Sequence, residues 1–182
     1  MIFFEIFIFS SYIGRVKFLK RKTMDKKVLI FLPFSSQKNV AEKGQPDLEM
    51  TRLSTSCELQ EIGEVYIYKD IQGNNVKEFI QKKIEELGPD WVVAEGNGAT
   101  ALLELKFPNS IMINPKVDYG SLGEVTKEVK DNSFGYFGMH FEKDYELFQS
   151  VYPNSAWYPA AEISVLSLKS TIETIVNCDE EW

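Results

Sequence analysis

The residues Ala94-Glu95-Gly96-Asn97-Gly98 form a tight turn between an apolar run and a short helical stretch at 99–105. Enzymes of acyl transfer hold a nucleophilic serine on such a strand–turn–helix unit, in the pattern small-x-nucleophile-x-small. Here the central position is Gly96, which has no side chain with which to attack. The spacing therefore suits either a nucleophile turn without its nucleophile or a simple glycine turn.

A second set of residues is a candidate for the same chemistry. Ser35 and Ser36 follow one apolar run, and His140 follows a later one, with Glu142 two residues further on. If both runs are parallel strands, their carboxyl ends meet at one edge of the sheet. A relocated serine–histidine pair is then geometrically possible. The simpler interpretation is that the serines are loop and capping residues and that the histidine is structural or exposed.

Other chemistries have weaker support. The stretch Gly96-Asn97-Gly98 could cradle a phosphate through backbone N–H groups at a helix N-terminus, but Glu95 would oppose the anion and no third glycine follows. Cys57 and Cys178 lie far apart and His140 is the single histidine, so we expect no metal site. We expect no cofactor.

Short apolar runs alternate with helical patterns along the chain. The runs lie at 28–32, 64–68, 91–94, 110–113, 134–137 and 156–158, and the helical patterns at 47–62, 74–87, 99–105, 121–130, 142–152 and 165–176. Strands separated by helices of this length are typical of βαβ units. The sequence predicts an α/β fold of three layers, α/β/α, around a mostly parallel sheet of about six strands.

The composition describes an ordinary globular protein with an acidic surface. The chain has 182 residues, of which 44% are hydrophobic and 26% charged, and its net charge is -7. This charge argues against a nucleic-acid partner. Two cysteines suit a reducing compartment, so we expect a cytoplasmic protein.

The first 23 residues differ from the rest. An apolar run at 1–14 precedes five basic residues, and Met24 then begins a sequence that leads directly into the first strand. The apolar run is too short to span a bilayer and lacks the features of a secretory signal. We interpret 1–23 as an upstream-start or disordered basic amphipathic extension, with a peripheral membrane anchor as the alternative, and 24–182 as one domain. No stable membrane insertion is expected.

Three stretches together resemble a known family. They are Lys27-Val-Leu-Ile-Phe-Leu-Pro-Phe-Ser-Ser36, the turn at 94–98, and Ile113-Asn114-Pro115. In order and spacing they are similar to the small single-domain α/β-hydrolases of the YqiA esterase type. Those proteins have a His-Gly-Phe-Asn-Ser-Ser loop, a Gly-x-Ser-x-Gly turn and a later Asn-Pro. The resemblance implies an α/β-hydrolase-like core without a lid domain.

The same resemblance implies that the family's chemistry is missing. Gly96 stands where the nucleophilic serine would be, and Pro33 replaces the glycine of the oxyanion loop. His140 falls at the position of the triad acid, with Glu142 close behind. Glu162 stands nearest the position of the final histidine. Without an imidazole there, a serine could not be activated in the usual way.

The function expected from the sequence is therefore a pseudohydrolase that binds a small-molecule ligand or a protein partner. We expect its pocket to be lined by Pro33, Phe34, Glu95, Asn97 and Asn114. One alternative is an active esterase or thioesterase with a relocated site at Ser35, Ser36 and His140. A second alternative is a flavodoxin-like or nucleotide-binding module that uses the turn at 96–98.

Overall fold

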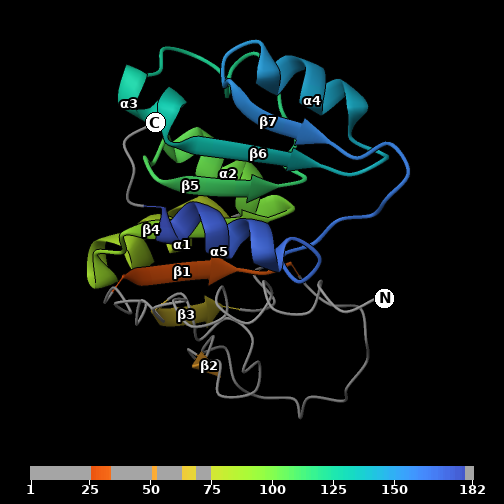
Figure 1. Ribbon diagram of the computed structural model, residues 1–182. Coiled ribbons are helices and arrows are strands. Elements are labelled where there is room, and N and C mark those ends of the chain that lie inside the picture. The colour runs from red at the N-terminus through yellow and green to blue at the C-terminus, as the bar shows by residue number, and fades with distance from the viewer. Residues whose placement is uncertain (1–25, 34–50, 53–62, 69–74, 179–182) are drawn as a thin grey trace, which may run out of the picture.

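The computed structural model of the chain describes residues 26–33, 51–52, 63–68 and 75–178 (Figure 1). A seven-stranded sheet runs through these residues in the order β2-β3-β1-β4-β5-β6-β7. Every neighbouring pair is parallel except β2 and β3, which are antiparallel. The strands are β1 (Lys27–Phe31), β2 (Thr51–Arg52), β3 (Glu64–Tyr68), β4 (Trp91–Glu95), β5 (Ser110–Ile113), β6 (Ser133–Phe137) and β7 (Asn154–Trp157).

Five described helices complete the fold: α1 (Val76–Leu87), α2 (Asn97–Leu105), α3 (Lys127–Asp131), α4 (Glu142–Gln149) and α5 (Lys169–Asn177). Each ends or begins for a local reason. Gly88 takes a left-handed conformation that stops α1. The Thr126 side chain accepts a hydrogen bond from the Val129 N–H and so fixes the start of α3.

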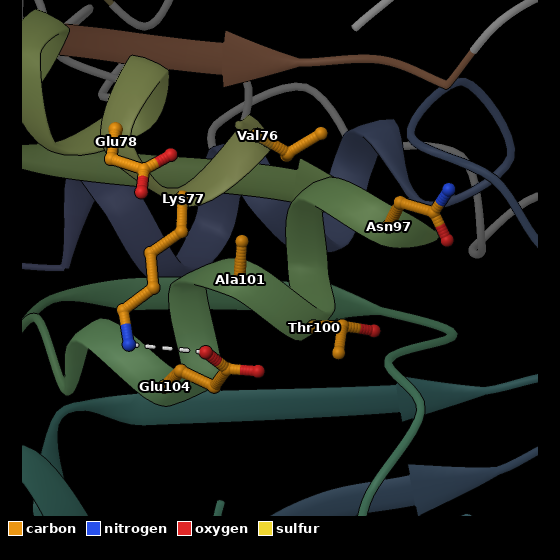
Figure 2. A pocket seen from close by; sticks show the side chains of 7 residues that line it. All are labelled: Val76, Lys77, Glu78, Asn97, Thr100, Ala101 and Glu104. Atoms are coloured by element: carbon orange, nitrogen blue, oxygen red, sulfur yellow. Dashed lines mark hydrogen bonds and ion pairs between the residues drawn. The ribbon is translucent and has the colours of Figure 1, made fainter. Parts of the chain in front are cut away.

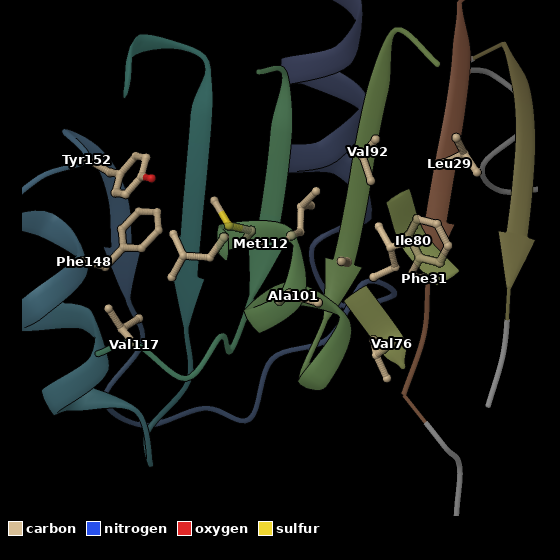
Figure 3. Packing of buried hydrophobic residues seen from close by; sticks show 14 of the residues in the cluster. Leu29, Phe31, Val76, Ile80, Val92, Ala101, Met112, Val117, Phe148 and Tyr152 are labelled. Carbon is tan, nitrogen blue, oxygen red and sulfur yellow. The ribbon is translucent and has the colours of Figure 1, made fainter. Parts of the chain in front are cut away.

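Helices cover both faces of the sheet, which confirms the predicted three-layer α/β fold. On one face, α1 to α4 pack on side chains such as Leu29, Phe31, Val92 and Met112 (Figure 3). On the other face, α5 packs through Ile172 and Val176 on residues that include Val28, Ile30, Val93 and Ile111. The central strands are buried on both faces, as their continuous apolar sequences predict.

The order of the strands places a switch point beside the turn at Gly96. The chain passes from β1 to β3 on one side, and then through α1 to β4 on the other side of β1. In open α/β sheets, ligands bind at the carboxyl ends of the two strands where the order reverses. Here these ends are followed by Leu32-Pro33 and by Gly96.

Three predicted helices differ from the structure. Thr51 and Arg52, predicted as helical, pair with Ile67 and Tyr66 as an edge strand, so this part of the 47–62 prediction is wrong. The free edge of β3 offers unpaired backbone groups, and a β-branched threonine suits an extended pairing. The rest of that segment lies outside the described residues.

The other two helices are shorter at their N-terminal ends. Ser121 belongs to a turn in which its N–H donates to Asp118 Oδ1 (2.7 Å), so the helix predicted from 121 begins only at α3. Before α5, the Ser164 N–H donates to Ser167 Oγ (2.7 Å), which holds 165–168 in a turn. In both cases local side-chain bonds compete with the helix.

Among the described residues, no helix has the length and apolar character needed to cross a membrane. Residues 1–23, Phe34, Ser35, Ser36 and Cys57 lie outside those residues. What the sequence predicts for them stays a prediction.

Candidate functional site

Gly96 occupies the sharp turn between β4 and α2 in an unusual backbone conformation, with φ 61° and ψ -123°. Its N–H donates to the Ile113 carbonyl oxygen (2.9 Å), and its own carbonyl oxygen accepts from the Thr100 N–H (3.0 Å). Residues with a side chain rarely adopt this conformation, and it costs them about 1–3 kcal/mol. A residue with a side chain could therefore hold this turn only under strain.

Among the described residues, few atoms lie near the Cα of Gly96 on its side-chain side. A Cβ atom built there would meet one described atom within 4 Å, the Cβ of Pro33 at 3.7 Å. At Gly98, by contrast, a Cβ would lie 3.4 Å from Phe31 Cβ and 3.6 Å from Ala94 Cβ. A Cβ at Gly98 would thus make ordinary van der Waals contacts with the sheet. Gly96 is a glycine because of its conformation.

Backbone donors remain at the start of α2. The N–H groups of Asn97, Gly98 and Ala99 have no hydrogen-bond acceptor among the described residues, and no side chain caps the helix. In the resembling esterases, the N–H that follows the nucleophile forms half of the oxyanion hole. Pro33 has no N–H to donate. The Asn97 N–H, directly after Gly96, has no acceptor among the described residues.

Asn114 connects the loops that follow β5, β6 and β7. Its side-chain Oδ1 accepts from the Gly138 N–H (2.8 Å), and its Nδ2 donates to the Ile163 carbonyl oxygen (3.1 Å). Its own backbone is left-handed, with φ 52°. The sequence predicted Asn114 as a pocket residue, and the structure shows its amide group occupied in holding the loops together.

His140 and Glu162 lie on the two neighbouring loops after β6 and β7. Their Nε2 and Oε1 atoms are 4.0 Å apart, and their side chains are 70% and 85% exposed. At this distance and exposure such a pair contributes little to stability. The structure thus brings together the two residues to which the resemblance assigns the positions of the triad acid and the final histidine. Glu142, the first residue of α4, is exposed.

Glu95 ends β4 and points to the face of the sheet that α5 covers. Its Oε2 accepts a hydrogen bond from the Val165 N–H (3.0 Å), a residue 70 positions away. Burial raises the pKa of the Glu95 carboxyl above its ordinary value of 4.5, and the bond from Val165 offsets only part of that shift. No salt bridge to Glu95 occurs in the described part of the chain.

A Glu95→Gln variant should reveal how much the burial of the Glu95 carboxylate destabilises the fold. Because the pKa of Glu95 is raised in the folded protein, its contribution to stability is present below 4.5 and is lost as the pH rises through the folded-state pKa. Glutamine keeps an acceptor for the Val165 N–H and carries no charge. Thermal unfolding should give the variant a higher midpoint than wild type at about pH 7 and the same midpoint at about pH 4. Glu162→Gln, which removes an exposed carboxylate, should show neither effect.

A groove of about 350 Å³ lies between the starts of α1 and α2 (Figure 2). Lys77 and Glu104 face each other across it with a 3.1 Å ion pair, and Asn97 and Thr100 line its other end. The Thr100 hydroxyl is not free, because it donates to the Gly96 carbonyl oxygen (3.2 Å) and accepts from the Lys116 N–H (2.9 Å). The groove thus borders the Gly96 turn.

Comparison with known proteins adds no relative: no protein family, no curated protein and no solved structure matches the chain. The candidate site is therefore defined only by the geometry of this structure. Of the residues predicted to act there, Pro33, Glu95, Gly96 and Asn97 gather at the switch point between β1 and β4. His140, Glu162 and Asn114 lie on the adjoining loops.

The sequence did not single out Thr100 or the Val165 amide, which hold the Gly96 turn and the Glu95 side chain. Thr100 carries a faint signal, since it stands one helical turn after Gly96 and can donate back to its carbonyl oxygen. No local sequence pattern indicates the contact between Val165 and Glu95, because the two residues are far apart in the chain.

Proposed function

We propose that this chain is a non-catalytic protein of α/β-hydrolase-like architecture that binds a small-molecule ligand or a protein partner at the carboxyl edge of its sheet. One observation carries the proposal. Gly96 takes the strained conformation of a nucleophile turn with space for a side chain, and it has none.

The surroundings of Gly96 support the same conclusion. Pro33, which lies next to the turn, cannot donate to an oxyanion. The loop after β7 presents Glu162 in place of a histidine, so a serine at position 96 would lack its usual base. Nucleophile, base and one oxyanion donor are absent together.

The nucleotide-binding alternative draws on the free N–H groups at the start of α2 and on the strand order, which contains the flavodoxin-like arrangement. Two features weigh against it. No third glycine follows Gly96 and Gly98, and the Glu95 carboxylate, next to the turn in the chain, disfavours an anion. We therefore rank it second.

An ester panel tests the proposal against the active-esterase alternative. Purified protein is incubated with short p-nitrophenyl esters and acyl thioesters, beside a Ser35→Ala, Ser36→Ala double variant. The expected result is no turnover above the buffer rate for either protein. Turnover by the wild type that the double variant abolishes would refute the non-catalytic function and favour the relocated site.

A restored triad tests the relation to hydrolases from the other direction. The variant combines Gly96→Ser, Glu162→His and His140→Asp, which places each triad group where the resemblance implies it. Mass spectrometry should detect labelling by a fluorophosphonate at position 96 in this variant, and no labelling there in Gly96→Ser alone. If the correctly folded triple variant stays unlabelled, the hydrolase-like plan of the site is contradicted.

A further inference from the structure

The backbone donors around the carboxyl edge are largely used within the protein. The N–H groups of Gly96, Asn114, Gly138, Met139 and Val165 all donate to protein oxygen atoms at 2.8–3.0 Å. These positions belong to the loops after β4, β5, β6 and β7. Apart from the first N–H groups of α2, these described positions therefore leave a ligand few free backbone donors.

The Glu95 carboxylate, in contrast, is an acceptor with few partners in the described part of the chain. One of its oxygens, Oε2, accepts from the Val165 N–H, and the other has no hydrogen-bond partner among the described residues. No lysine, arginine or histidine of the described chain forms an ion pair with it. Half-buried charges are normally paired, because a single neutral donor does not replace the water that burial removes.

The position of Glu95 suggests that a ligand group pairs with its carboxylate. The residue ends β4 at the switch point of the sheet, directly before Gly96. Among the described residues, a Cβ at Gly96 would have only Pro33 within 4 Å, and Pro33 on the other side of the switch point is exposed. Binding sites of this kind use a few convergent polar groups to fix a ligand.

We propose that the ligand of this site carries a positively charged nitrogen, and that the Glu95 carboxylate pairs with it. This inference rests on the proposed ligand-binding function and adds the chemical class of the ligand. A primary ammonium group fits best, because it gives charge-assisted N–H donors to a carboxylate oxygen.

The free N–H groups at the start of α2 favour the opposite charge, but the Glu95 side chain points to the other face of the sheet. Ala99 packs in the cluster under α1 to α4, whereas Val165, which holds Glu95, packs in the cluster under α5. An anion bound at α2 would be a different site, and the test below distinguishes it.

Three probes with the same four-carbon chain provide the test: n-butylammonium, n-butanol and n-butyrate. Each is titrated into the full chain, labelled with ¹⁵N, and the Val165 amide signal is followed, because this N–H is bonded to Glu95 itself. The expected result is a saturable shift with n-butylammonium that neither other probe produces. Glu95→Gln should weaken that binding roughly ten-fold or more, and Glu128→Gln, which removes an exposed carboxylate in α3 at the amino end of β6, should leave it unchanged.

Several results would overturn the inference. These are equal shifts with n-butanol, unchanged binding in Glu95→Gln, or no saturable shift with the ammonium probe. Saturable shifts of the Asn97 and Gly98 amides with n-butyrate alone would also overturn it, while leaving the proposed ligand-binding function standing. Ester turnover would instead refute the proposed function, so the two failures are distinguishable.

Discussion

Replacing Gly135 with alanine is expected to destabilise the protein by about 3 kcal/mol, the upper range for overpacking a core. A Cβ at this position in β6 would lie 2.5 Å from Cε1 of Phe148 and 2.8 Å from two further atoms of its ring. The ring cannot move away easily. Phe148 is fully buried, stacks on Tyr152 at 4.5 Å between centroids and contacts the edge of Phe137 at 5.4 Å.

Urea unfolding measures this effect, and two further variants interpret it. Gly123→Ala is the matched control, because its Cβ would meet only the flexible end of Lys106 and one carbonyl oxygen. We expect it to change stability by about 0.5 kcal/mol or less. In a Phe148→Leu background, Gly135→Ala should lower the free energy of unfolding by less than it does in the wild type, because the two side chains compete for the same space. Equal costs in both backgrounds would contradict the proposed clash.

Replacing Asn114 with alanine is expected to cost about 2–4 kcal/mol. The change removes the acceptor of the Gly138 N–H and the donor to the Ile163 carbonyl oxygen, and because both bonds are only partly buried, their loss together costs about 1–3 kcal/mol. The left-handed backbone at Asn114 adds about 1 kcal/mol of strain for a residue such as alanine. Urea unfolding would measure the sum of these two contributions, provided that the dependence of the unfolding free energy on urea concentration is unchanged.

Asn109 provides the control that separates the two contributions. It has the same left-handed backbone, with φ 56°, and its side chain makes no hydrogen bond in the described part of the chain. Asn109→Ala should therefore show the strain alone. Asn114→Gly should remove the strain and retain the loss of the two bonds. Similar costs for Asn109→Ala and Asn114→Ala would mean that the side-chain amide of Asn114 does not hold the loops.

The sheet was largely predictable because its strands are buried on both faces. Sequences such as KVLIF and WVVAE have no other favourable place than the middle of a covered parallel sheet. The Gly96 turn was predictable for a related reason, since small residues at fixed spacing are needed where a strand turns sharply into a helix. The N-terminal ends of α3 and α5 were not predictable, because individual hydrogen bonds of Thr126 and Ser167 set them.

The contacts that shape the site were beyond prediction from local patterns. The bond from Val165 to Glu95 and the bridge that Asn114 makes to Gly138 and Ile163 join residues 24 to 70 positions apart. Their presence depends on which loops meet in space. The sequence could name Glu95 and Asn114 as residues of the site, and only the fold shows that one is held by a single donor and the other is fully bonded.

The bridge made by Asn114 also constrains how this protein can change over evolutionary time. A single amide group ties the loop after β6 to the loop before α5, and the Met139 N–H adds a bond to the Ala161 carbonyl oxygen (2.9 Å). An insertion or deletion in either loop would shift the partner groups of the other. These two loops should therefore keep their lengths together in diverging copies of the chain, even where their exposed residues are replaced.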